Sequence, residues 1–192
     1  MKYKILSLLI IVALISVGAC QKKKEPGEKE AAKKVSGDYV INFKPNDSLD
    51  LVPPKTIILQ PAGRAEGENA FNLAVVAKGV DQLSQVSFDL TFDPASVSYL
   101  GFKPGELFEQ KGKVEYKIGP KGDQKGKLEV KISPEGGQTV SGGGKVVILS
   151  FKGLQPGRGD ILFENGELID GRKKRLADTN WVGGLLWILE TG

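Results

Sequence analysis

The chain has 192 residues and a formal net charge of +4, with a single cysteine, Cys20, and no histidine. Without histidine it lacks the usual general base, the commonest transition-metal ligand and any Ser-His-Asp triad, and a single cysteine excludes an internal disulfide. We therefore expect a protein that is not an enzyme and that holds no cofactor or metal of its own.

An apolar segment opens the chain and ends at Cys20. Two lysines precede an almost wholly apolar run over residues 5–17, and the small residues Gly18 and Ala19 lead to the cysteine. The run is too short to cross a bilayer and has the layout of a secretory signal. The segment resembles a bacterial lipoprotein processing box, which implies removal of residues 1–19, a diacylglyceryl group on the Cys20 thiol and a further acyl chain, such as palmitate, on its amine. The alternative is an ordinary secretory signal with an incidental cysteine.

Residues 20–37 are predicted to be the lipidated cysteine and a flexible charged tether. They are rich in Lys, Glu, Gly and Ala and cannot bury enough apolar surface to offset the entropy of ordering. Of the total charge of +4, the signal carries +2 and residues 21–34 carry +3, which leaves −1 for residues 35–192. A nucleic-acid partner is therefore not expected. Gln21 stands where an aspartate would favour the inner membrane in lipoproteins, so the resemblance implies the outer membrane.

The rest of the chain reads as short strands. Residues 38–55 are predicted to be an extension or an edge strand that ends at Pro53-Pro54. Regular turn signals then separate strand patterns with no convincing helix, which predicts an all-β, nine-stranded antiparallel β-sandwich over residues 56–192. The strand patterns fall at residues 56–60, 71–76, 85–93, 97–102, 113–118, 127–132, 145–151, 160–164 and 185–189.

Alternation is clearest in residues 85–93, where Ser87, Asp89 and Thr91 alternate with apolar residues. A period of two predicts one buried face and one wet face. Residues 185–189 are apolar throughout, so Trp187 is expected in the core.

Carboxylate pairs are the remaining candidates for chemistry. Such pairs could support acid–base work or bind calcium through oxygen. No dense Asp/Asn loop is present, so we expect them to be solvated charges, with calcium more readily placed on a partner. The pairs are Asp89 with Asp93, Glu164 with Glu167, and Asp170 with Asp178.

Aromatic residues offer a second kind of site, because sugars stack on exposed aromatic faces. Trp181 lies in a Gly-containing segment near the C-terminus, and Tyr99 lies near a predicted loop. A module that binds polysaccharide through Trp181 and Tyr99 is therefore the alternative function on the same sandwich.

Several segments resemble the cohesin domain in order and spacing. Residues 86–94 form an aromatic-rich strand that ends in Phe-Asp-Pro, and a loop with Pro104-Gly105 follows. Residues 144–152 resemble a core strand of that family, and residues 176–184 resemble its C-terminal end. The resemblance covers about residues 56–190. It implies a jelly-roll sandwich, related to some carbohydrate-binding modules, that binds calcium-carrying dockerin modules through a polar sheet face.

The same resemblance implies which residues would contact a partner. A typical cellulosomal cohesin has an aspartate where Ser87 falls, whereas here the acid is Asp89, two residues along the same face. We expect the face to be exposed and to bind a dockerin-like module or a component of an envelope or secretion assembly. A structural adaptor that pairs through an edge strand is a further alternative. The implied contact positions are Gln85, Ser87, Asp89, Thr91, Lys113, Glu115, Lys117, Glu129 and Lys131.

Overall fold

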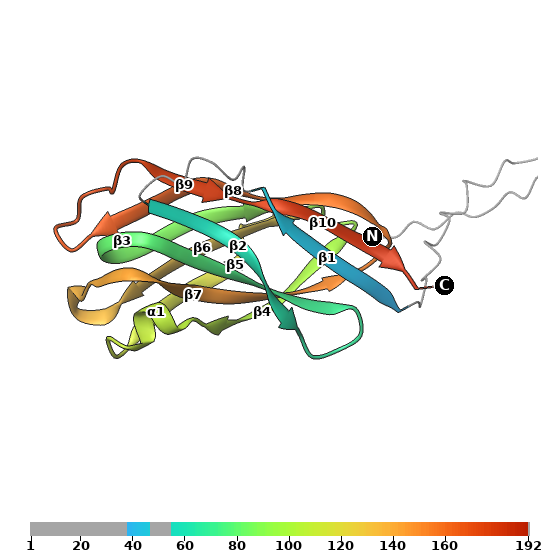
Figure 1. Ribbon diagram of the computed structural model, residues 1–192, viewed down its shortest axis with the longest axis horizontal. Coiled ribbons are helices and arrows are strands. Elements are labelled where there is room, and N and C mark those ends of the chain that lie inside the picture. The colour runs from blue at the N-terminus through green and yellow to red at the C-terminus, as the bar shows by residue number, and fades with distance from the viewer. Residues whose placement is uncertain (1–37, 47–54, 192) are drawn as a thin grey trace, which may run out of the picture. The chain divides into compact units, whose positions relative to one another are not determined.

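The structure, a computed structural model, describes residues 38–46 and 55–191. Cys20, the predicted signal and the predicted tether lie outside the described residues. The described part forms ten β-strands, a short helix and one 3-10 turn (Figure 1), and none of its helices is long and apolar enough to cross a membrane. The elements are β1 Tyr39–Pro45, β2 Lys55–Arg64, β3 Ala70–Thr91, β4 Val97–Pro104, α1 Glu106–Glu109, β5 Val114–Pro120, β6 Lys127–Pro134, η1 Glu135–Gly137, β7 Val140–Gly153, β8 Gly157–Asp170, β9 Thr179–Val182 and β10 Gly184–Glu190.

The longest strand, β3, takes part in both layers of the fold. Its first half pairs with β2 and β7, and its second half pairs with β6 and β8. Between the halves, Gly79 and Gln82 have positive φ values of 63° and 48°, and the register with β7 shifts there. The strand therefore bends without ending, and the prediction of separate strands at residues 71–76 and 85–93 is wrong.

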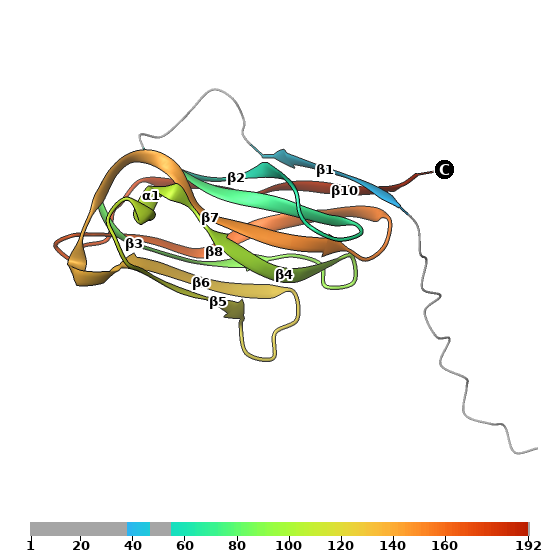
Figure 2. The same cartoon turned by 90° about the horizontal axis from the view of Figure 1, so that it is seen from below.

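The strands form two facing layers that share β3 (Figure 2). One layer has the order β9-β2-β3-β7-β4, and the other has the order β1-β10-β8-β3-β6-β5. Every neighbouring pair is antiparallel except β2 and β9, which are parallel. The predicted all-β sandwich is confirmed, but with ten strands instead of nine. Two predicted strands merge into β3, β9 was not predicted, and β1 is the edge strand expected within residues 38–55. Its jelly-roll connectivity stays a prediction.

The core lies between these layers and follows the period-two pattern of the sequence. Val86, Phe88 and Leu90 of β3 are at most 2% exposed. A buried side chain of this size stabilises the fold by about 1.5–3 kcal/mol. The largest fully buried side chains on neighbouring strands include Leu59, Leu128, Ile132, Leu149, Phe151 and Ile161.

Strand β10 corrects one prediction about the core. Leu186 and Ile188 point inward and are 2% exposed, whereas the intervening Trp187 is only partly buried and lies on the outer face. The expected core position of Trp187 is therefore wrong. Because residues 185–189 are all apolar, the sequence carries no signal that distinguishes the inner face of this strand from the outer one.

Strand β1 forms one end of its layer. It pairs with β10 from Tyr39 opposite Glu190 to Pro45 opposite Gly184, and Ile41 and Phe43 pack against the core. Figure 2 shows β1 and β10 along one side of the molecule and β5 and β6 along the opposite side.

Candidate functional site

The outer surface of β5, β6, β3 and β8 is the candidate site, and we call it the polar face. Strand register aligns Lys117, Lys131, Ser87 and Glu167 in one row across the four strands. Outward positions of an antiparallel sheet that lie opposite each other share a face. The fold therefore brings together eight of the nine implied contact positions, and the ninth, Lys113, lies one residue before β5. The eight are Gln85, Ser87, Asp89, Thr91, Glu115, Lys117, Glu129 and Lys131.

Exposure differs among these eight residues. The four on β5 and β6 are exposed, and Gln85, Ser87 and Thr91 on β3 are half-buried. Asp89 is only 3% exposed, so the expectation that it lies open to a partner is wrong. A partner would meet the side chains of β5 and β6 more readily than those of β3.

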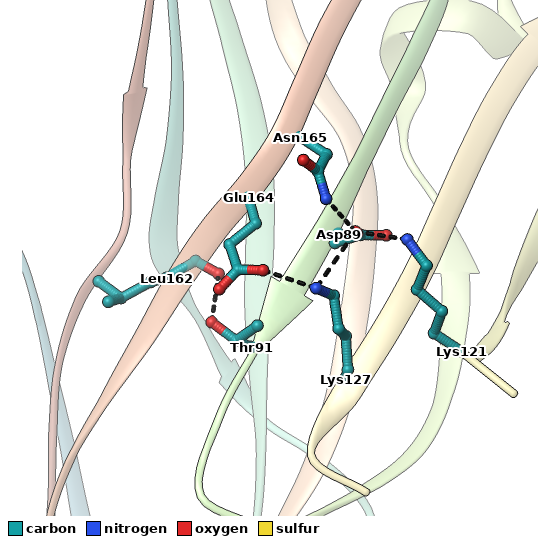
Figure 3. A network of polar contacts seen from close by, with 7 residues as sticks. All are labelled: Asp89, Thr91, Lys121, Lys127, Leu162, Glu164 and Asn165. Atoms are coloured by element: carbon teal, nitrogen blue, oxygen red, sulfur yellow. Dashed lines mark hydrogen bonds and ion pairs between the residues drawn. The ribbon is translucent and has the colours of Figure 1, made fainter. Parts of the chain in front are cut away.

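Asp89 is buried by polar side chains that reach over it (Figure 3). Its Oδ2 accepts hydrogen bonds from Lys121 Nζ at 2.7 Å and from Asn165 Nδ2 at 2.6 Å. Lys127 Nζ lies 3.5 Å from the same oxygen and donates to Glu164 Oε2 at 2.6 Å. The acid therefore sits at the centre of a charged network that we call the Asp89 network: Asp89, Lys121, Lys127, Glu164 and Asn165.

A one-residue bulge in β8 positions Asn165. The register passes from Ser87 opposite Glu167 to Asp89 opposite Glu164, so β8 carries one extra residue there. Asn165 adopts a positive φ of 51° in this bulge, as asparagine does more readily than most residues. The bulge thus aims the amide of Asn165 at Asp89.

The inner side of the same bulge faces Trp181. A Cβ added to Gly166 would lie 2.3 Å from the Trp181 ring. The ring also packs against Phe163 and Phe88, with centroid distances of 5.3 and 5.8 Å. Asn165 and Gly166 therefore hold a surface network on one side and a core aromatic cluster on the other.

The electrostatics of the Asp89 network favour its ionised form. Burial alone would raise the pKa of Asp89, but the hydrogen bonds from Lys121 and Asn165 and the charges of Lys121 and Lys127 outweigh it and lower that pKa below 3.8. The hydrogen bond to Glu164 raises the pKa of Lys127. At neutral pH Asp89 is therefore ionised, and two lysines lie beside the two carboxyl groups of the network.

Most other charges near the face are paired within the sheet surface. Lys113 Nζ lies 2.8 Å from Glu135 Oε1, and Lys117 Nζ lies 3.0 Å from Glu115 Oε1. Arg175 Nε lies 4.0 Å from Glu167 Oε1. Exposed pairs of this kind contribute little to stability. Glu129 and Lys131, adjacent outward positions on β6, form no ion pair with any described residue.

Five of the six candidate carboxylates act as caps of turns or as parts of ion pairs, and the sixth, Asp178, is exposed. Asp93 accepts a hydrogen bond from the backbone N–H of Ala95, and Asp170 accepts from those of Arg172 and Lys174. Within residues 38–46 and 55–191, no three Asp or Glu side chains gather as metal ligands would.

The two candidate sugar-binding aromatics do not meet. Trp181 lies on β9 and Tyr99 on β4, at opposite edges of one layer. Tyr99 packs against Phe151 with a centroid distance of 5.9 Å, and burial raises the pKa of Tyr99 to about 12. Because Trp181 is also packed against the core, the two rings form no common platform for a glycan.

Sequence reasoning missed the residues that surround Asp89. Lys121 lies in the turn after β5, where a strand pattern gives no information. The Asn165-Gly166 dipeptide did carry a signal, because such a pair inside a strand pattern is typical of a bulge. The predicted strand at residues 160–164 ended there instead.

No family model matches the chain, and no curated protein matches it. Solved structures of cohesins do match its fold. A non-cellulosomal cohesin from the archaeon Archaeoglobus fulgidus has a TM-score of 0.53 at 16% identity, over 68% of this chain and 88% of that one. The second type II cohesin module of an adaptor scaffoldin from Acetivibrio cellulolyticus has a TM-score of 0.58 at 15% identity, over 70% and 89%.

A third match is a type II cohesin from Acetivibrio cellulolyticus, solved in complex with an X-dockerin. It has a TM-score of 0.55 at 15% identity, over 68% of this chain and 95% of that one. At such identities the likeness concerns the fold alone. The cohesin-like sandwich implied by the sequence is confirmed at that level.

Proposed function

We propose that this chain is an exported, lipid-anchored module that binds another protein through the polar face. A dockerin-like module is the first candidate partner, and a component of an envelope or secretion assembly is the second. The likeness to cohesins carries the proposal, because one of the similar cohesins was solved in complex with an X-dockerin.

The surface chemistry of the polar face supports a protein partner. Its exposed side chains stand on a sheet and offer many hydrogen-bond donors and acceptors, as the polar parts of protein interfaces do. Glu129 and Lys131 have no ionic partner within the described part of the chain, so they can pair with charges on another protein. The polar groups of the Asp89 network already pair with one another. The network would therefore keep the sheet surface rigid beneath a bound partner.

The anchoring part of the proposal rests on the sequence. Cys20 is the only cysteine among 192 residues and stands at the end of the apolar N-terminal run. Acylation of this residue would hold the module at a bacterial membrane, and the outer membrane is the expected location.

The binding proposal is tested by calorimetric titration of the chain with a set of dockerin modules in the presence of calcium. We expect the double charge reversal Glu129→Lys/Lys131→Glu to weaken binding roughly tenfold or more, because like charges would then face each other at the interface. The net charge of the chain is unchanged by this swap.

The matched control is Glu66→Lys/Lys103→Glu, which reverses two exposed charges away from the polar face. Binding that falls equally in both variants would contradict the assignment to the polar face. A failure of every dockerin to bind would contradict the choice of partner.

Acylation is tested in a Gram-negative host supplied with a labelled palmitate analogue. The chain should carry the label and sediment with the outer membrane, and Cys20→Ser should lose both properties. A chain that reaches the membrane without label would show that Cys20 is not the attachment point.

A further inference from the structure

An apolar surface lies beside the polar face, on the outer side of β1, β10 and the first part of β8. We call it the apolar strip: Val40, Leu162, Leu185, Trp187 and Leu189. Val40, Leu162 and Leu189 are 45%, 42% and 50% exposed, and they make up half of the six exposed large apolar side chains in the described residues. Their inward neighbours, including Ile41, Ile161 and Ile188, fill the core, so the strip is a second apolar face of the same strands.

Strand register makes this surface continuous. Val40 lies opposite Leu189, Trp187 lies between Asn42 and Arg158, and Leu185 lies between Lys44 and Asp160. The guanidinium carbon of Arg158 is 5.7 Å from the centre of the Trp187 ring, a cation–π contact. The strip therefore joins aliphatic side chains, one tryptophan, two cations and one carboxylate on a three-stranded surface.

These groups suit the interface of a lipid bilayer. Tryptophan favours the boundary between headgroups and acyl chains, where its ring is apolar and its N–H stays wet. Lysine and arginine beside it attract anionic headgroups by about 1 kcal/mol each. A contiguous exposed apolar surface on a soluble domain marks a protein or membrane contact.

The N-terminal chain favours the membrane among these possibilities. The strip begins at Val40, twenty residues after Cys20. A flexible chain of that length spans about 25 Å. A lipid on Cys20 would therefore hold the strip close to the bilayer at an effective concentration in the millimolar range.

We infer that the apolar strip rests on the anionic bilayer surface in which Cys20 is anchored. This inference builds on the acylation proposed above. It also predicts how the module is oriented on the membrane, because Figure 2 shows β1 and β10 on the side opposite β5 and β6. With the strip on the lipid, the exposed residues of β5 and β6 remain available to a partner.

The two tryptophans give a direct test, since they are the only ones in the chain. The acylated mature chain is placed in vesicles of phosphatidylethanolamine and phosphatidylglycerol with brominated acyl chains. In Trp181→Phe the remaining Trp187 should be quenched by bromine, whereas in Trp187→Phe the remaining Trp181, packed against Phe88 and Phe163, should not be.

A second measurement needs no lipid on the protein. The mature chain with Cys20→Ala is sedimented with the same vesicles. Leu189→Asp should lower its partition coefficient roughly tenfold, because a half-exposed leucine would no longer enter the interface. Leu100→Asp is the matched control, since Leu100 is 51% exposed but lies on β4 in the other layer.

The outcomes separate this inference from the acylation proposal. Protein mass shows whether Cys20 carries lipid, whatever the strip does. Lipidated protein with unquenched Trp187, or equal effects of the two leucine variants, would overturn the inference. Protection of Trp187 from soluble acrylamide without quenching by bromine, together with a doubled sedimentation mass, would show that a second copy covers the strip and would also overturn it.

Discussion

Asp89 joins three separate parts of the fold. It lies on β3, Lys121 follows β5, and Asn165 belongs to the bulge of β8, and both side chains donate to the same carboxylate oxygen. A residue expected to contact a partner therefore serves to fix the surface on which a partner would bind.

Replacement of this carboxylate should cost stability. Asp89→Asn keeps the size of the side chain but removes the charge that Lys121 and Lys127 face, so the free energy of unfolding at neutral pH should fall by about 2 kcal/mol. Urea unfolding measures this change. Ser87→Ala, on the same strand and face, is the control and should change it far less.

The acid dependence of stability follows from the same residue. The pKa of Asp89 is lower in the folded chain than its ordinary value of 3.8, so its contribution is fully present above 3.8 and is lost as the pH falls through the folded value. The stability gap between wild type and Asp89→Asn should therefore shrink in acid. A gap that stays constant from neutral pH to well below 3.8 would contradict an ionised Asp89.

At the scale of elements, the bulge of β8 links the surface to the core. Gly166 leaves room for the Trp181 ring of β9, and β9 in turn pairs with β2 in the one parallel contact of the fold. Any side chain at this position must displace the Trp181 ring, which packs against Phe88 and Phe163.

Gly166→Ala should therefore destabilise the protein by about 1–3 kcal/mol through overpacking. Thermal unfolding followed by circular dichroism would show a lower midpoint. Gly119→Ala is the control, because a Cβ there meets nothing within 4 Å. Equal midpoints for the two variants would mean that the ring shifts without cost.

Local pattern decides which elements could be predicted. The strand positions follow from period-two alternation, which can be read within a few residues. The burial of Asp89 could not be read in this way, because Lys121 and Asn165 lie 32 and 76 residues away in sequence. The outward position of Trp187 was hidden for another reason, since an all-apolar strand gives both faces the same character.

At the scale of the whole molecule, the folded unit includes β1. Ile41 and Phe43 pack against the core, and the strand pairs along its whole length with β10. The described fold thus begins before residue 55, close to the end of the predicted tether.

A chain of residues 55–192 should be less stable than one of residues 38–192. Loss of Ile41 and Phe43 from the core should lower the free energy of unfolding by about 2–3 kcal/mol, measured by urea unfolding. A chain of residues 21–192 should match residues 38–192, because the additional residues are the predicted tether. A shorter chain of equal stability would mean that β1 adds nothing to the fold.

Because β3 belongs to both layers, the two layers should unfold together. Neither layer can unfold alone, since the loss of one layer removes a strand from the other. Unfolding should therefore be a single cooperative event, with few partly open forms at equilibrium. If the module is exported, as proposed above, this cooperativity would limit the exposed chain that a protease can reach, and it would do so without a disulfide.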